Sequence, residues 1–492
     1  TRAEGSLRRL WSTDLLDLCM RFNVDLDRVE TNLLTRSQTA PPQDPGMTPE
    51  DLVEDQRRRT PGLQSPKPAV QVLGEAAQLY GLLLSFDPAV VRRARDLLYN
   101  AAVINSRPTE RGVQEIDGAH PLYGYQRLRG KPLYEMEDKD FLCLEEGMQD
   151  GLLQYYVDVS QGQQELGTML EQLLASPNTP YFPLQQQSIH TCVGALTRGT
   201  MDYLKSRMRQ QAYEDIARHC GDELVRLCEY RGYRNKHNKL ASVLALSFSS
   251  EPTQSSVAVV LNENGVVADH CILGKGGHVS RLDEESFLQN IQKIYEKNTV
   301  DVVVMNAALQ SQTLQLQRMV EEMLDRVSTE KPEVLIIDDS VAQLRQARDD
   351  SVYYEQALDK YKHGIYMARY LQDPLREVCA LDNNPTSPEE SDLFQLQLHP
   401  YQSSVPTSYL RRVFTRELCS EVANAGVCIQ DAMAYQDAYA ELQFLPGLGF
   451  RKVRAMVDKL VTVGKGMKNR EDMKTALGLG DTVFKNCNGF IR

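Results

Sequence analysis

The sequence has little that would mark a secreted, disulfide-rich or membrane protein. Its ten cysteines form no CxxC pair, and their spacing matches neither a zinc ribbon nor a dense disulfide framework. Scattered cysteines without a signal peptide indicate a reducing compartment, the cytosol or the nucleus. The longest strictly apolar runs, such as 257–261 and 302–305, are far too short to cross a bilayer. The sequence also lacks an initiator Met, so we expect a fragment or a processed chain.

Motifs for common catalytic chemistries are missing too. No GxSxG occurs, and the glycine-rich segment 274–278 lacks the spacing of a phosphate-binding P-loop, so it predicts a flexible loop. The His-Cys pairs at 219–220 and 270–271 are adjacent residues, which is not the spacing of metal ligands. We therefore expect no cofactor, no metal site and no catalytic nucleophile.

The composition that is present is that of a globular protein, with 42% hydrophobic and 25% charged residues. The length of 492 residues allows about three to five domains. The 55 basic and 67 acidic residues leave a formal net charge of −12. This balance argues against a small basic DNA-coating protein, although one domain can still carry a basic patch.

The N-terminal half reads as helical, with one proline-rich interruption. Apolar spacing predicts helix over 6–34, where Asp25 caps the last part. Seven of the 22 prolines fall within 35–68, which predicts a long extended connection or mobile loop. Further helices are expected over 70–84, 88–104 and 181–233, with Thr109 as a cap at the turn 107–112.

One segment of this half combines tyrosines with basic residues. A packed linker between helices is the favoured interpretation, and a surface that faces nucleic acid, with cations beside stacking aromatics, is the alternative. The residues concerned are Tyr123, Tyr125, Arg127, Arg129, Lys131 and Tyr134.

In the centre of the chain, from residue 242, the composition changes to β-branched runs separated by polar turns. The predicted order is β-β-β-α-β-α-β-α, a mixed sheet covered by helices, which is also the order of the RNase-H-like nuclease fold. Asn264-Gly265 predicts a hairpin turn between the second and third strands. The expected strands are 242–248, 255–261, 266–272, 300–305 and 333–338, with helices over 283–297, over 310–327 and from 341.

The acids that such a nuclease needs are absent from the expected positions. Two catalytic metal ions require several converging carboxylates, the essential one on the first strand. Here Ser247 stands at that position, and the strand ending at Asn306 supplies no acid either. Asp338 and Asp339 fit a strand-end turn and helix cap better. We therefore predict a non-catalytic nuclease-like domain; the rival is a metal-dependent nuclease using Asp338, Asp339 or Asp373.

The sharpest motif lies near the end of the sequence. Residues 444–453 have the form apolar-Pro-Gly-apolar-Gly before an amphipathic helix, and 477–485 repeat the turn and helix, which predicts tandem helix-hairpin-helix motifs. Backbone N–H groups at such turns form a nest for a phosphate. The predicted nucleic-acid-binding residues are Gly447, Leu448, Gly449, Arg451, Lys452, Arg454, Gly478, Gly480 and Lys485.

Local charge supports that prediction, because 444–492 carry ten basic and four acidic residues. Binding through phosphates would be independent of sequence and sensitive to salt. The alternative is that the hairpins only pack against neighbouring domains. Val453 and Val483 stand where small residues are common, and Asp481 places an anion at the second nest, which favours that alternative.

The succession of parts resembles the core of the suppressor-of-Ty-six family, eukaryotic transcription elongation factors and histone chaperones, and also their bacterial relative Tex. Segments 22–33, 104–123 and 131–142 resemble the family's helix-turn-helix region and the segment after it. Leu244–Ser250 resembles the first strand of its YqgF-type domain, 370–375 a motif shared with Tex, and 486–491 the last helix of its second hairpin.

The resemblance implies a multidomain, mostly α protein with one inactive α/β domain. It also implies a nuclear protein that travels with RNA polymerase II, binds DNA and histones, and has no enzymatic activity. The family's death-like, S1 and SH2 domains would come after Arg492, and a Tex-type RNA-binding factor is the alternative. The expected domains are 1–150 (helical, with the helix-turn-helix-like part), 151–240 (connector), 241–363 (RNase-H-like), 364–425 (connector) and 426–492 (tandem helix-hairpin-helix).

Overall fold

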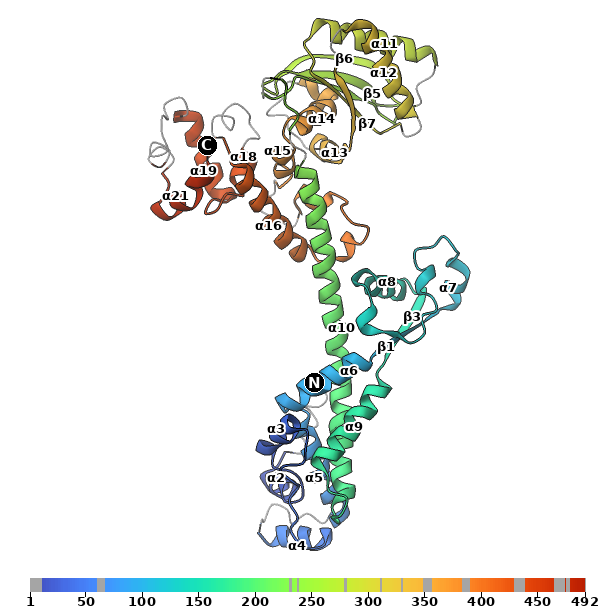
Figure 1. Cartoon of the computed structure of the whole chain (residues 1–492), viewed down its shortest axis with the longest axis vertical. Helices are drawn as coiled ribbons and strands as arrows, with labels where there is room; N and C mark the ends of the chain where they lie inside the picture. The colour runs from blue at the N-terminus through green and yellow to red at the C-terminus, as the bar shows by residue number, and fades with distance from the viewer. Residues whose placement is uncertain are drawn as a thin grey trace. The chain divides into compact units, whose positions relative to one another are not determined.

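The chain is mostly helical, with two separate sheets, and divides into two compact units (Figure 1). The units are Thr1–Asp215 and Ile216–Arg492. The computed structural model describes residues 11–59, 67–229, 232–236, 239–277, 281–309, 312–328, 331–347, 356–382, 390–428, 439–463, 474 and 478–491. The multidomain, mostly α architecture predicted from the sequence is confirmed.

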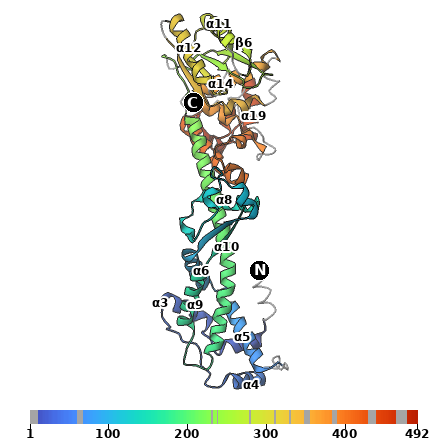
Figure 2. The ribbon, with the colours of Figure 1, turned by 90° about the vertical axis from the view of Figure 1, so that its right-hand side faces the viewer.

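The first unit is built on helices packed around the start of one long helix, α10 (Phe182–Glu229). Helix α5 runs alongside the N-terminal part of α10 in both ribbon views (Figures 1 and 2). Gly81 of α5 permits this approach, because a Cβ there would collide with the Ser188 carbonyl. The surrounding helices are α2 (Thr13–Met20), α3 (Leu26–Thr35), α4 (Pro49–Arg59), α5 (Ala69–Leu84), α6 (Pro88–Ala101) and α9 (Ser160–Leu174).

Two details of this unit differ from the sequence prediction. The stretch 35–68 contains helix α4, because Pro49 occupies a first helical position and Leu52 and Val53 are buried in the core. The helix expected over 88–104 ends at Ala101, since the β-branched pair that comes next enters a strand. By contrast, Asp25 caps α3 as predicted, its carboxylate accepting from the Asp27 N–H at 3.3 Å.

A small antiparallel sheet comes next in the same unit, and the sequence reasoning did not predict it. Its order is β2-β1-β3, and helix α8 (Asp138–Gln149) covers one face. Thr109 caps α7 (Glu110–Glu115) as predicted, its hydroxyl accepting from the Gly112 N–H at 3.0 Å. The strands are β1 (Val103–Pro108), β2 (Lys131–Pro132) and β3 (Leu153–Asp158), with short 3-10 turns at Tyr123–Tyr125 and Leu133–Glu135.

The second unit contains the mixed sheet, and it confirms the RNase-H-like prediction. The strand order is β6-β5-β4-β7-β8. Strands β4, β7 and β8 run parallel to one another, and β5 pairs antiparallel with both β4 and β6. Gly265, at φ +67°, makes the predicted hairpin turn. The strands are β4 (Val243–Ser247), β5 (Ser255–Leu261), β6 (Val267–Lys275), β7 (Val302–Asn306) and β8 (Glu333–Ile337).

Helices cover both faces of this sheet. Helices α11 (Arg281–Lys297) and α12 (Thr313–Val327) pack on the face that presents Leu244, Leu246 and Val260. Helix α14 (Lys362–Gln372) packs on the opposite face, where a Cβ at Gly364 would meet Val259 and Ser247. The domain boundaries remain a prediction, but α14, which begins at the predicted boundary, packs against the sheet rather than leaving it.

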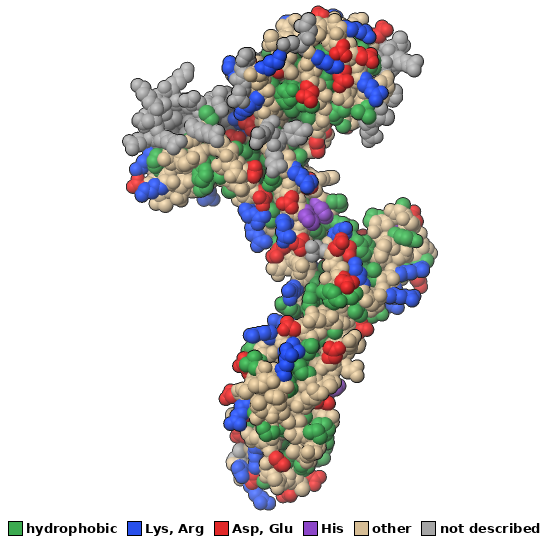
Figure 3. Space-filling view, viewed as in Figure 1, with side chains coloured by type: hydrophobic (Ala, Val, Ile, Leu, Met, Phe, Trp, Pro, Cys, Tyr) green, Lys and Arg blue, Asp and Glu red, His purple; other side chains and the backbone are tan. Residues whose placement is uncertain are grey.

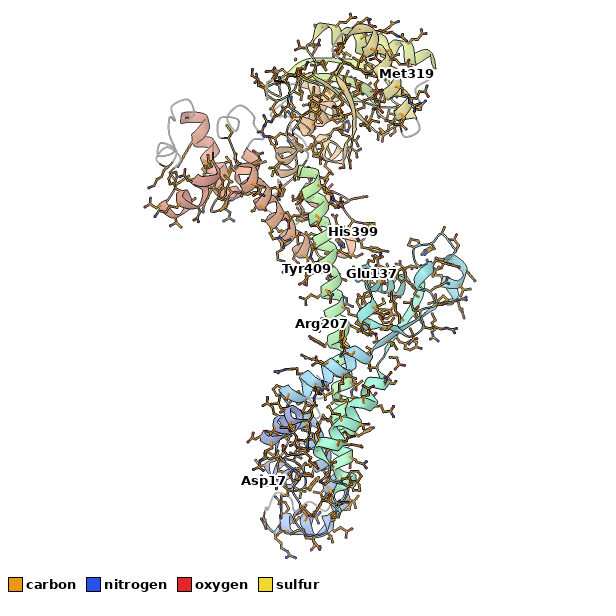
Figure 4. All side chains as sticks on the ribbon, in the orientation of Figure 1. Asp17, Glu137, Arg207, Met319, His399 and Tyr409 are labelled. Carbon is orange, nitrogen blue, oxygen red and sulfur yellow. The ribbon has the colours of Figure 1, made fainter. Side chains whose placement is uncertain are left out.

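The remainder of this unit is helical. His399, labelled in Figure 4, stacks on His219 of α10, with ring centroids 6.2 Å apart. The elements are α13 (Ser340–Gln346), α15 (Pro374–Cys379), α16 (Thr407–Ala425), α18 (Tyr439–Leu442), α19 (Phe450–Val463) and α21 (Asp481–Cys487), with 3-10 turns at Gln356–Tyr361, Asp392–Gln395, Gln402–Ser404 and Asn488–Phe490.

No single helix among the described residues has the length and apolar character to cross a membrane. The pair α5 and α6 meets that test only together, across a bend of 76°.

Candidate nucleic-acid interface

The first hairpin turn has the geometry predicted from its glycines. Gly447 has φ +85°, a conformation that side chains rarely adopt, and the Leu448 N–H donates to the Leu445 carbonyl at 3.0 Å. Helix α19 then begins, with the Lys452 and Val453 N–H groups donating to the Gly449 carbonyl. At this helix start the N–H groups that precede Lys452 have no partner within the helix, and the helix dipole makes this end positive.

Helix α19 is amphipathic at this end. Val453 and Met456 are buried, whereas Arg451, Lys452 and Arg454 are exposed (Figure 3 shows basic side chains in this module). The Lys452 ammonium donates back to the Gly447 carbonyl at 2.7 Å, so one of the predicted cations also closes the turn. Three exposed cations beside a helix N-terminus provide a positive surface suited to phosphate.

The second hairpin repeats the turn and packs on the first. Gly478 has φ +68°, and Gly480 is the residue before α21, whose Lys485 is exposed. A Cβ on Gly447 would lie 3.3 Å from the Cβ of Asn486, so α21 sits directly against the first turn. The structure thus brings the two sets of predicted residues into one module. Whether these residues bind nucleic acid remains a prediction.

The anion at the second turn is neutralised within the module. Asp481 forms an ion pair with Lys474, whose hydrogen bond and charge lower the pKa of that carboxyl. Lys459 of α19 also reaches this turn, because a Cβ on Gly478 would lie 2.8 Å from its Nζ. Lys459 and Lys474 count among the basic residues of 444–492, but the sequence pattern placed neither of them at the second turn.

The two valines that depart from the helix-hairpin-helix pattern are both accommodated in the module. Val453 is buried. The Cα of Val483 lies 3.6 Å from the position of a Cβ placed at Gly447, so the backbone of α21 approaches the first turn closely.

The edge of the mixed sheet, where a nuclease would hold metal, carries a hydrogen-bonded chain instead. The Ser247 hydroxyl lies 2.7 Å from Nδ1 of His363, and Nε2 of the same ring lies 3.2 Å from Asp339. The Asn306 amide donates to Asp339 at 2.9 Å and also bonds both backbone groups of Phe248. These residues line a pocket of about 750 Å³.

The carboxylates considered for a nuclease do not converge here. Asp339 reaches the pocket, but Asp338 accepts from the Ser340 N–H at 2.8 Å, which is the predicted strand-end turn. The predicted helix cap is not formed, because Asp339 stands at the N-cap of α13 without a side-chain capping bond. Asp373 caps α15 and pairs with Arg376. Within the described ranges no group of three or more His, Cys, Asp or Glu side chains is arranged to hold a metal ion. His363, which no sequence motif marks, occupies the space between Ser247 and Asp339.

The charge state of Asp339 results from these contacts. Burial raises the pKa of its carboxyl, but hydrogen bonds from His363 and Asn306 outweigh burial and lower the pKa to about 2. Asp339 is therefore ionised at neutral pH, with its oxygens already engaged by protein donors.

Comparison with known proteins supports the helix-hairpin-helix prediction and the resemblance to the family. A family model described as a helix-hairpin-helix motif matches residues 391–492. The Suppressor of Ty 6 homolog of Caenorhabditis briggsae is 24% identical over 457 residues, covering 86% of this chain and 30% of that protein. The chain is related to the suppressor-of-Ty-six proteins. This confirms the resemblance predicted from the sequence.

Other suppressor-of-Ty-six relatives give the same picture. Transcription elongation factor spt6 of Schizosaccharomyces pombe is 23% identical over 508 residues, covering 100% of this chain and 36% of that protein. Transcription elongation factor SPT6 of Drosophila melanogaster is 23% identical over 461 residues, covering 86% of this chain and 25% of that protein. The chain spans about a third of the length of the curated relatives it matches.

Proposed function

We propose that this chain is part of a transcription elongation factor and binds the DNA backbone through its helix-hairpin-helix module. The observation that carries the proposal is the pairing of a Gly447 turn with exposed Arg451, Lys452 and Arg454 at the start of α19. Backbone N–H groups and cations contact phosphates and not bases, so the binding would be independent of sequence. The matched helix-hairpin-helix segment and the relatives' names support this role.

The proposal extends to histones and RNA polymerase II as partners, in the nucleus. An acidic chain with a net charge of −12 and a basic C-terminal module has one surface for DNA and others for basic histones. The relatives named as transcription elongation factors support the polymerase as partner. They are eukaryotic proteins, which favours this role over that of a bacterial Tex-type RNA-binding factor.

We also propose that the chain is not an enzyme. Ser247 and Asn306 supply no carboxylate where two metal ions would be held, and Asp339 is engaged by His363, Asn306 and Gln343. The rival nuclease hypothesis makes a clear prediction: Mg²⁺- or Mn²⁺-dependent cleavage of branched or single-stranded substrates, lost in Asp339→Asn. No cleavage above a metal-free control supports the non-enzymatic role.

The experiment measures binding of the whole chain to a fluorescent DNA duplex and to purified histone complexes over a range of KCl concentrations. DNA affinity should fall steeply with salt, with a log–log slope of about −0.9 for each phosphate contacted. Histone binding should not compete with duplex DNA if acidic surfaces outside the hairpins carry it. A salt-independent duplex affinity, or none at low salt, would remove DNA binding from the proposal.

A further inference from the structure

The exposed face of the small sheet β2-β1-β3 has features that the proposed function does not use. Opposite residues of an antiparallel pair share a face, and successive residues alternate. Asn105 pairs with Tyr156, and Arg107 pairs with Gln154, so these four side chains lie on the same face. The other face holds Tyr155, whose ring packs edge-on against Phe141 of α8 at 6.1 Å.

The side chains of this face are presented to solvent. Tyr156 is 57% exposed, and Arg107 and Gln154 are exposed as well. The Arg107 guanidinium is held along the sheet by two hydrogen bonds to the Gln154 side-chain carbonyl, at 3.1 and 2.9 Å. An ordered cation close to an exposed aromatic ring on the neighbouring strand is thus built into the sheet.

A neighbouring loop carries two more exposed arginines at the edge of the sheet. The Asn105 side chain accepts from the Gly130 N–H at 2.9 Å, and the Ser106 N–H donates to the Leu128 carbonyl at 3.0 Å, so this loop runs along β1. Arg127 and Arg129, on either side of Leu128, are exposed. Across the residues that the structure describes, neither side chain has a hydrogen bond, an ion pair or a ring contact.

The residues of the segment 123–134, which combines tyrosines with basic residues, therefore have two different roles. Tyr125 and Lys131 bond to the Asp140 carboxylate at 2.7 and 2.9 Å, which is the packed-linker role favoured from the sequence. Arg127 and Arg129 do not take part in that packing. The carboxylate on the exposed face, Asp158, lies at the far end of the β1–β3 pair and accepts from Ser160.

We propose that this face, with Arg107 and Tyr156, binds single-stranded nucleic acid together with Arg127 and Arg129 of the loop at the sheet edge. A base stacks on the Tyr156 ring, and the arginines contact the phosphates of the strand that crosses the sheet. Stacking on an exposed aromatic needs an unpaired base, because bases in a duplex are covered on both sides. Three cations without carboxylate partners complement the phosphates of such a strand. This surface is separate from the hairpin module, which we propose for duplex DNA.

The test uses the whole chain and fluorescence anisotropy with labelled oligo(dT) and oligo(rU) of about 12 nucleotides. Arg127→Gln/Arg129→Gln removes two exposed cations that have no hydrogen bond, ion pair or ring contact within the described residues, so we expect the fold to be left intact. We expect single-strand affinity to fall about fivefold or more and the log–log salt slope to flatten by about 1. Arg318→Gln/Arg326→Gln, two exposed arginines of α12, is the matched control and should change neither quantity.

Tyr156 variants separate stacking from charge. Tyr156→Ala should weaken single-strand binding about fivefold or more, while Tyr156→Phe, which keeps the ring, should stay within about twofold of the wild type. Duplex affinity should be unchanged in every variant of this face, whereas hairpin variants should lower it, so the two proposals fail separately. Single-strand affinity that is unchanged in the arginine and Tyr156→Ala variants, or lowered equally in the control, would overturn the proposal.

Discussion

His363 and Ser247 lie 116 positions apart in the sequence, yet Nδ1 of the imidazole is 2.7 Å from the serine hydroxyl. Both side chains are buried. The contact joins α14 to the end of β4, at the place where an RNase-H-like nuclease carries its first catalytic acid. The hydrogen bond between the Ser247 hydroxyl and the His363 imidazole links β4 to α14 at this position.

The first prediction concerns the contribution of the Ser247–His363 hydrogen bond to stability. Ser247→Ala leaves a buried ring nitrogen of His363 without its partner and should destabilise the mixed-sheet domain by about 1–3 kcal/mol. Differential scanning calorimetry of the whole chain provides the measurement. Ser250→Ala, at an exposed serine just beyond the end of β4, is the control and should be neutral. Equal stability of the two variants would show that the hydrogen bond contributes nothing.

The second prediction is a pH dependence that originates at Asp339. Its folded-state pKa of about 2 lies below the ordinary value of 3.8, so its contribution to stability is present above pH ~4 and is lost as the pH falls toward ~2. Because the carboxyl is only partly buried, that contribution is about 1–2 kcal/mol. Asp339→Asn should therefore be less stable than the wild type near pH ~6, with a difference that shrinks by pH ~3. A difference independent of pH would contradict the assignment.

The third prediction concerns the contact between the two hairpins. Gly447→Ala places a side chain at φ +85° and 3.3 Å from Asn486, so it should destabilise the module by about 1–2 kcal/mol. Gly449→Ala is the matched control, because a Cβ there meets no atom within 4 Å. Hydrogen exchange of peptides covering 444–456 reports the difference. Unchanged exchange in Gly447→Ala would show that the turn does not need glycine at 447, and equally fast exchange in both variants would show that the effect is not specific to that position.

The fourth prediction concerns the ion pair at the second hairpin. Asp481→Asn removes the carboxylate that Lys474 neutralises, so the lysine becomes available to a phosphate. Duplex DNA affinity should rise about two- to threefold, and the salt dependence should steepen by about one phosphate contact. Asp96→Asn, at an exposed carboxylate of the first unit, is the control and should leave affinity unchanged. A lower affinity in Asp481→Asn would place that carboxylate among the binding groups.

Local patterns in the sequence predicted the mixed sheet well. Residues 243–246 and 257–261 are continuous apolar runs, and Asn264-Gly265 predicts the hairpin turn, so strand positions and order could be inferred directly. The small sheet was not predicted because its strands mix polar with apolar residues, β2 has only two residues, and loops and helices separate the strands. Helix α4 was not predicted because Pro49 is one of the prolines that indicated a loop, although the first position of a helix tolerates proline.

The residues of the candidate site also fall into those that the local sequence predicts and those that only the fold brings together. The glycine turns and the cations beside them were predictable, since both are encoded within about ten residues of sequence. The position of His363 beside Ser247 depends on a contact between segments 116 residues apart. The positions of Lys459 and Lys474 at the second turn depend on how their side chains pack, which their place in the sequence does not report. No spacing rule in a single sequence reports such contacts.

The central claim, that the hairpin module binds DNA through phosphates, is tested most directly by charge reversal. The measurement is duplex DNA affinity as a function of KCl for the wild type and for Arg451→Glu/Lys452→Glu/Lys485→Glu, with Arg318→Glu/Arg326→Glu as a control. We predict that the triple variant loses affinity about 100-fold or more at low salt and has a flatter salt dependence, while the control keeps most of its affinity. Unchanged affinity in the triple variant, with the module still folded, would contradict the claim.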